Sequence, residues 1–169
     1  EKVHLDLKKI KITNTRKSTP AYMLYGETGR YPLQINIDTK IIRFWNNIIT
    51  NDSNKYSNTI YRIMTQSDQP CRWLNYVRSI LDNTGYSFFV LNQSNIISKN
   101  IHLLIKQVLI DQFISDWNGK LQASNIGKLY YLYKQQHKRE DYLTLLPRNL
   151  YLPLLKFRTA NHRLPVEIL

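Results

Sequence analysis

The sequence contains a single cysteine, Cys71, so no disulfide bond can form within the chain. It therefore gives no support for an oxidising compartment, and we interpret Cys71 as a buried, reduced thiol. No N-terminal apolar run of the signal-peptide type is present. No stretch approaches the ~18 uncharged apolar residues that a membrane span needs. These absences predict an intracellular protein, nuclear or cytoplasmic, with no membrane partner.

The sequence also lacks the motifs of common catalytic and cofactor-binding sites. Neither the phosphate-binding loop G-x-x-x-x-G-K-[ST] nor the dinucleotide fingerprint G-x-G-x-x-G is present. The histidines are scattered, and none has a cysteine or another histidine at ligand spacing. The carboxylates show no paired spacing of the kind that acid–base catalysis uses. We therefore predict no catalytic residues, no metal site, no cofactor and no small-molecule substrate.

Acidic residues are scarce relative to basic ones. The chain has 24 Lys and Arg against 12 Asp and Glu, which gives a formal net charge of +12. The excess is even along the sequence, since residues 1–100 carry 14 basic and 7 acidic groups and the remainder carries 10 and 5. Such a balance favours polyanionic partners through counterion release. The alternative is a soluble basic protein with no ligand.

Glycine and proline are sparse, and apolar residues recur at helical spacings, which predicts an all-α protein. An amphipathic helix is expected over residues 41–49, with Asp38 as its N-cap and Asn51 and Asp52 at its end. Residues 33–37 alternate between apolar and polar, which fits a short extended run before that helix.

Further helices are expected over residues 57–66 and 71–84. A short helix should begin with Pro20 in its first turn and end at Gly26 or Gly29. Residues 87–91 form a brief apolar run that fits a turn or an isolated extended segment.

A row of apolar residues at strict four-residue steps predicts the longest helix, over residues 97–123. The row comprises Ile97, Ile101, Ile105, Leu109, Phe113, Trp117 and Leu121. Because a helix has about 3.6 residues per turn, each step drifts by roughly 40°, and different partners should cover successive turns. We therefore expect an irregular helical bundle around one long central helix, without a sizeable sheet. It forms a single domain, 1–169, or two lobes, 1–92 and 93–169.

The C-terminal part gathers cations around an amide. Pro153 is expected in the first turn of a final helix that ends near Ala160. The candidate polyanion-binding residues at this helix end are Lys156, Arg158, Asn161, His162 and Arg163. Leu154 and Phe157 are expected to be the buried anchor that holds them. The alternative is that the cations only complement the helix dipole.

Tyrosines and basic residues are interleaved between residues 128 and 139. The stretch contains Lys128, Tyr130, Tyr131, Tyr133, Lys134, His137, Lys138 and Arg139. Aromatic rings can stack on unpaired bases while neighbouring cations follow the phosphate backbone. We therefore add Lys138, Arg139 and Arg30 to the candidate nucleic-acid-binding residues. The alternatives are that the tyrosines pack in a core and that Arg30 braces a corner at residues 29–32.

Four segments together resemble a known family. They are Ser18-Thr19-Pro20, residues 25–33 (Tyr-Gly-Glu-Thr-Gly-Arg-Tyr-Pro-Leu), the following expected helix that contains Trp45, and residues 157–167 (Phe-Arg-Thr-Ala-Asn-His-Arg-Leu-Pro-Val-Glu). Their order and spacing are similar to the region downstream of the polymerase domain in non-LTR retrotransposon reverse transcriptases, a helical connector before a C-terminal zinc knuckle. The resemblance implies that the cationic C-terminal residues contact an RNA or DNA backbone, and that Arg30 and Tyr31 belong to a structural corner.

The sequence departs from that family in ways that limit its expected function. It has no Asp-Asp pair of the polymerase type, and Ile168-Leu169 stand where the knuckle region is expected. It begins with Glu1 and stops at Leu169, so we expect a fragment cut at both ends. We therefore expect a non-catalytic nucleic-acid-binding connector, whose partners are RNA and/or DNA and the polymerase domain of the parent protein. The alternative is a structural scaffold that packs against the polymerase thumb without touching nucleic acid.

Overall fold

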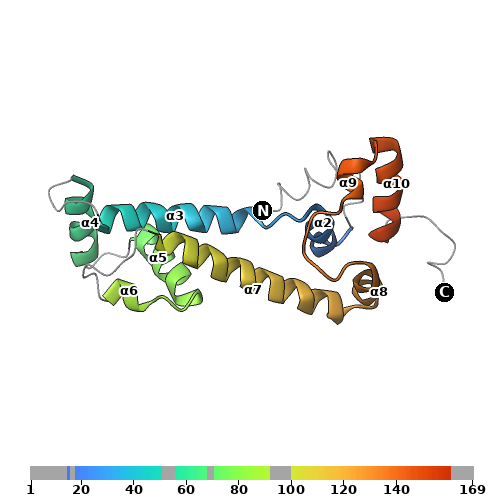
Figure 1. Ribbon diagram of the computed structural model, residues 1–169. Helices are drawn as coiled ribbons and strands as arrows, with labels where there is room; N and C mark the ends of the chain where they lie inside the picture. The colour runs from blue at the N-terminus through green and yellow to red at the C-terminus, as the bar shows by residue number, and fades with distance from the viewer. Residues whose placement is uncertain (1–14, 16–17, 51–55, 68–70, 92–99, 161–169) are drawn as a thin grey trace. The chain divides into compact units, whose positions relative to one another are not determined.

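The computed structural model describes residues 15, 18–50, 56–67, 71–91 and 100–160. In these ranges the chain is helical and has no strand, which confirms the all-α prediction (Figure 1). The helices are α2 (Ala21–Thr28), α3 (Leu33–Thr50), α4 (Tyr56–Gln66), α5 (Arg72–Asn83), α6 (Phe88–Leu91), α7 (Ile101–Ala123), α8 (Asn125–Tyr133), α9 (Tyr142–Leu145) and α10 (Arg148–Arg158). None of these helices combines the length and the apolar character that crossing a bilayer requires.

The chain divides into two compact units. Unit 1 comprises Glu1–Pro32 and Phe113–Leu169, and unit 2 comprises Leu33–Gln112. Unit 1 therefore joins the N-terminal part of the sequence to its C-terminal part. Whether the protein forms one domain or lobes at 1–92 and 93–169 stays a prediction.

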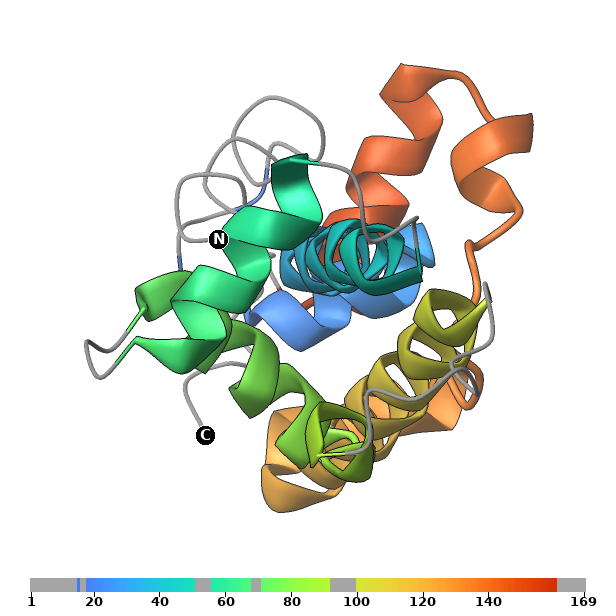
Figure 2. The ribbon, with the colours of Figure 1, turned by 90° about the vertical axis from the view of Figure 1, so that its left-hand side faces the viewer.

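The core of unit 2 lies between α3, α4, α5 and the first turns of α7. From α3 it takes Ile42, Trp45 and Ile48, which belong to the predicted helical stripe. The Trp45 indole Nε1 donates a hydrogen bond to Tyr61 Oη at 3.2 Å, which links α3 to α4. Helix α4 runs across the C-terminal end of α3 (Figures 1 and 2). The helices expected over 57–66 and 71–84 are confirmed.

The expected start of α3 was wrong. The helix already begins at Leu33, so residues 33–37 are helical and Asp38 lies inside the helix instead of capping it. Ile35 is buried, because it extends the stripe of Ile42 and Trp45 by nearly two turns. Residues Asn51 and Asp52, expected to end the helix, lie outside the described residues.

Two smaller expectations in unit 2 also need correction. Residues Phe88–Leu91 form the short helix α6, not a turn or an extended segment. Cys71 is half-buried, and it packs against the edge of the core as the residue that precedes α5.

The core of unit 1 lies between α2, the later turns of α7, and α8. Its buried centre consists of Met23, Trp117, Leu121 and Tyr130. Trp117 Nε1 donates to the Tyr22 carbonyl at 2.9 Å, and Tyr130 Oη donates to the Met23 carbonyl at 3.2 Å. These bonds satisfy the polar atoms of two large buried rings.

Helix α7 confirms the expectation that its apolar row meets different partners along its length. Ile101 and Ile105 are buried in the core of unit 2, whereas Trp117 and Leu121 are buried in the core of unit 1. The drift of a four-residue repeat around a 3.6-residue helix produces this change of partner. Helix α7 begins at Ile101, not at residue 97 as expected, and Ile97, the first member of the row, lies outside the described residues.

The start of the final helix was also wrong. Helix α10 begins at Arg148, directly after Pro147, so Pro153 lies in its interior and not in its first turn. A proline there lacks the N–H that would bond to a carbonyl one turn earlier, a cost that tertiary packing must offset. The buried residue Leu155 and the contacts of Arg158, described below, supply that packing.

Candidate nucleic-acid interface

Two segments far apart in the sequence meet at the end of α2. Helix α2 ends at Thr28 and is followed by Gly29 in the left-handed conformation, with φ of 60°. Thr28 forms an isolated antiparallel bridge with Arg139, and the Glu140 N–H donates to the Glu27 carbonyl at 3.0 Å. A Cβ at Gly29 would collide with the backbone of Arg139, so the close approach requires glycine.

This bridge brings three of the predicted site residues together. Arg30 follows the glycine on one side, and Lys138 and Arg139 lie on the other. All three side chains are exposed. We define Arg30, Lys138 and Arg139 as the bridge cluster.

A buried carboxylate lies beside the bridge cluster, one residue before Thr28. Glu27 is 0% exposed, and its two oxygens have different donors. Arg158 Nε donates to Oε1 at 3.0 Å, and Tyr142 Oη donates to Oε2 at 2.6 Å. A buried charge is tolerated only when it is paired and hydrogen-bonded, and both conditions hold here.

A second carboxylate extends these contacts. Glu140 forms an ion pair with Arg158 Nη2 at 3.2 Å through Oε2, and it pairs with Lys134 Nζ through Oε1. Lys134 is only 2% exposed and also donates to the Lys138 carbonyl at 2.6 Å. We define Glu27, Lys134, Glu140, Tyr142 and Arg158 as the internal network. Its two carboxylates and two cations give it no net charge.

The internal network changes the protonation behaviour of its members. Burial, together with the negative charge of Glu27, raises the pKa of the Tyr142 phenol above its ordinary value. Burial by itself would lower the pKa of Arg158, but Glu27 and Glu140 outweigh it and the pKa is raised. At neutral pH the network therefore holds a neutral phenol and a charged guanidinium.

The predicted site residues fall into three groups. Arg30, Lys138 and Arg139 are exposed and come together. Arg158 is 16% exposed and its guanidinium is held in the internal network, while Lys156 is half-buried on the same helix. Asn161, His162 and Arg163 lie outside the described residues.

The expected anchor of the C-terminal helix was wrong by one position. Leu154 is 37% exposed and Phe157 is 53% exposed, whereas Leu155 is fully buried. Successive residues on a helix are separated by roughly 100°, so a shift of one residue moves the buried face by more than a quarter turn.

The tyrosines of α8 divide between core and surface. Tyr130 is buried, as in the core-packing alternative, whereas Tyr131 and Tyr133 are exposed. His137 lies among aromatic rings: it stacks on Tyr31 with 5.0 Å between centroids and meets Trp117 edge-on at 5.3 Å. Burial and the nearby charge of Lys134 lower the pKa of His137, which favours its neutral form.

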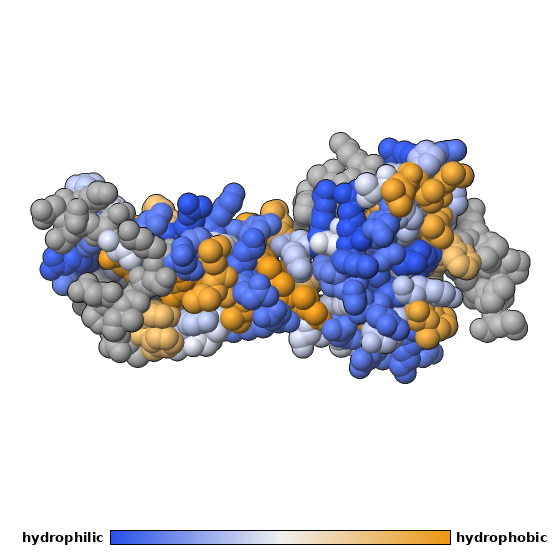
Figure 3. Space-filling model, viewed as in Figure 1, coloured by the Kyte–Doolittle hydropathy of each residue, from blue (hydrophilic) through white to orange (hydrophobic). Residues whose placement is uncertain are grey.

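The described residues of unit 1 carry more basic than acidic side chains. They comprise nine basic and four acidic residues. Among its described residues, those outside the internal network are seven basic and two acidic: Arg30, Lys120, Lys128, Lys138, Arg139, Arg148 and Lys156, against Asp116 and Asp141. Hydrophilic side chains accordingly cover much of the face of this unit shown in Figure 3.

The described part of the chain contains no group of three or more His, Cys, Asp or Glu side chains that could hold a metal ion. No protein-family model, curated protein or solved structure matches the chain.

Proposed function

We propose that this chain is a non-catalytic, nucleic-acid-binding helical connector from a retroelement RNA-directed DNA polymerase, and that it helps to handle template RNA or target DNA. One observation carries the nucleic-acid-binding part of the proposal, and its retroelement part rests on the resemblance of the sequence segments. The internal network neutralises its own charges, so the remaining described surface of unit 1 has seven cations against two carboxylates. Such a surface attracts a phosphate backbone and releases condensed counterions when it binds.

The bridge cluster is the proposed centre of this surface. Arg30 and Arg139 carry planar guanidinium groups that suit phosphate oxygens, and Lys138 adds a point charge. Contacts to phosphates fix the position of a strand but read no sequence. We therefore expect binding with little sequence preference. In this proposal Arg158 holds together the two segments that the Thr28–Arg139 bridge joins, and it does not touch nucleic acid.

The proposal is tested by titrating labelled RNA and duplex DNA with the full chain at several salt concentrations. The logarithm of affinity should fall linearly with the logarithm of salt, with a slope of about 0.9 per neutralised phosphate on duplex DNA. Three contacts from the bridge cluster would contribute about 2.7 to that slope. A slope near zero, or no binding at low salt, would reject the proposal.

A second candidate function is a structural scaffold that packs against the polymerase domain of the parent protein. Exposed apolar side chains on one face of α10 favour it. Leu150, Leu154 and Phe157 follow a spacing of four and three residues and are all at least 37% exposed. Binding to a separately expressed polymerase fragment, without binding to RNA or DNA, would support the scaffold in place of the connector.

A further inference from the structure

A small pocket lies at the C-terminal end of α8, next to the bridge cluster. Its volume is about 230 Å³, and its lining consists of Leu132, Tyr133, Lys134, Gln135, Gln136, Lys138 and Glu140. This is below the roughly 300–1,000 Å³ of sites that enclose a whole drug-sized ligand. The pocket therefore suits a single planar ring system that projects from a larger molecule.

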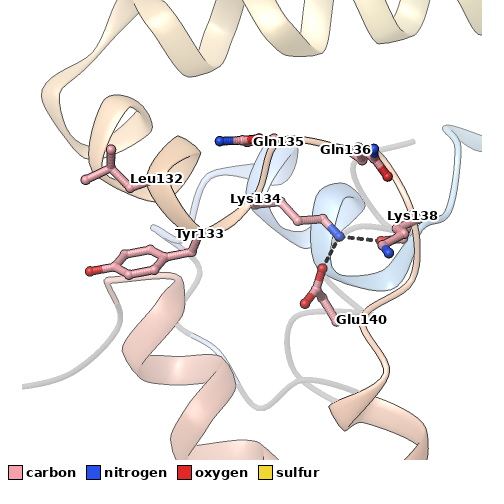
Figure 4. A pocket seen from close by; sticks show the side chains of 7 residues that line it. All are labelled: Leu132, Tyr133, Lys134, Gln135, Gln136, Lys138 and Glu140. Carbon is pink, nitrogen blue, oxygen red and sulfur yellow. Dashed lines mark hydrogen bonds and ion pairs between the residues drawn. The ribbon is translucent and has the colours of Figure 1, made fainter.

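The floor of the pocket is held in place by the internal network. Lys134 lies in the middle of the pocket and contacts both Glu140 and the Lys138 carbonyl (Figure 4). The Lys138 N–H also donates to the Gln136 carbonyl at 3.0 Å, which closes a turn between them. These bonds fix the loop before any ligand arrives, so little entropy is lost on binding.

The side chains around this floor differ in chemistry. Leu132 and Tyr133 lie at one end of the pocket, Gln136 and Lys138 lie at the other, and Gln135 lies above the Lys134–Glu140 pair (Figure 4). The Tyr133 side chain is 58% exposed. The pocket thus combines an accessible aromatic ring, two amides that each donate and accept hydrogen bonds, and one exposed cation.

These groups match the parts of one nucleotide in a single strand. A base has a flat face that stacks on tyrosine, an edge that pairs with amides, and a phosphate that attracts lysine. The only carboxylate in the lining is Glu140, whose oxygens are paired with Lys134 and Arg158, so it repels a phosphate weakly. A base stacked inside a duplex cannot enter such a pocket.

We propose that this pocket binds one unpaired base of an RNA or DNA strand whose phosphates contact Lys138 and Arg139, so that the protein prefers single strands to duplexes. This inference rests on the proposed nucleic-acid binding and adds to it the class of ligand. Lys138 belongs to both sites, and a strand that follows the bridge cluster passes the pocket directly.

The test compares three labelled ligands of equal length, by fluorescence anisotropy with the full chain: a single-stranded oligonucleotide, its duplex, and an abasic strand that has only sugars and phosphates. The single strand should bind more tightly than either the duplex or the abasic strand at the same salt concentration. Tyr133→Ala should weaken single-strand binding by roughly 5- to 150-fold, the cost of one stacked base, and leave duplex binding unchanged.

Two variants serve as controls. Tyr133→Phe keeps the ring and should bind the single strand as the wild type does. Tyr56→Ala removes a tyrosine that is 81% exposed in unit 2, and it should change nothing. Both tyrosines are exposed, so neither alanine variant is expected to unfold, and circular dichroism checks this.

The outcomes separate this inference from the proposed function. Salt-dependent binding of the three ligands with equal affinity, or an unchanged single-strand affinity for Tyr133→Ala, would reject the pocket and leave the connector function standing. An absence of binding to every ligand at low salt would reject both.

Discussion

Arg158 Nε lies 3.0 Å from Oε1 of Glu27, and this carboxylate has no exposed surface. The pair joins the final helix to the last turn of α2, two segments that the sequence places near its opposite ends. The Arg158 guanidinium, which the sequence predicted to bind a polyanion, thus holds two segments of unit 1 together. The hydrogen bonds that Arg158 and Tyr142 donate to Glu27 help to offset the cost of burying it.

Arg158→Ala should therefore destabilise the protein. It leaves a buried carboxylate without its charged partner, which costs on the order of 3 kcal/mol. Urea unfolding followed by circular dichroism measures the change. Arg148→Ala is the matched control, because it removes an exposed arginine from the same helix and should change the free energy of unfolding by at most about 0.5 kcal/mol. Equal effects of the two substitutions would contradict the structural role of the pair.

The parts of the fold that depend on local pattern could be predicted from the sequence. Ile42, Trp45 and Ile48 repeat with the period of a helix, and Gly29 ends α2 as glycine commonly does. The sequence does not show which face of α10 is buried, because the adjacent residues Leu154 and Leu155 are equally apolar and only Leu155 is buried.

The candidate site was predictable only in part. Arg30 and Arg139 each stood out as cations next to an aromatic or basic neighbour, but nothing local indicates that a bridge joins their segments. The pairing of Glu27 with Arg158 is equally non-local. One feature of the sequence does indicate a buried carboxylate. Glu27 lies four residues after Met23, on a helical face that carries apolar residues. A carboxylate on such a face needs a buried partner, which Arg158 provides.

Removing the bridge cluster should weaken nucleic-acid binding and its salt dependence together. The triple variant Arg30→Ala, Lys138→Ala, Arg139→Ala should lower the slope of log affinity against log salt on duplex DNA by about 2.7. The control variant Lys40→Ala, Arg43→Ala, Arg78→Ala removes the same charge from exposed positions of unit 2 and should keep the slope. Identical slopes for the two triple variants would show that net charge, not the cluster, determines binding.

The phenol of Tyr76 should make stability depend on pH in alkaline solution. Tyr76 Oη donates to Asp38 Oδ1 at 2.7 Å, and this hydrogen bond, with burial and the charge of Asp38, raises the pKa of Tyr76 to about 12 from 10.0. Because the folded pKa is the higher one, the contribution is complete below pH 10 and is lost as the pH rises towards 12.

Tyr76→Phe isolates this contribution. The difference in free energy of unfolding between wild type and variant should be constant at neutral pH and shrink between about pH 10 and 12. Denaturant titrations at a series of pH values measure it. A difference that stays constant up to pH 12 would mean that the bond to Asp38 does not persist in solution.

The close approach at Gly29 gives the sharpest test of the site geometry. Gly29→Ala adds left-handed strain, which costs about 1–2 kcal/mol, and also a collision with the backbone of Arg139. Gly85→Ala is matched for strain, since Gly85 has φ of 80° but no atom within 4 Å of an added Cβ. Gly29→Ala should therefore destabilise the protein more than Gly85→Ala does, as measured by urea unfolding.

Gly29→Ala should also weaken nucleic-acid binding, because it separates Arg30 from Arg139, whereas Gly85→Ala should leave affinity unchanged. Equal losses of stability, with affinity intact in both variants, would mean that the two segments do not meet at this glycine.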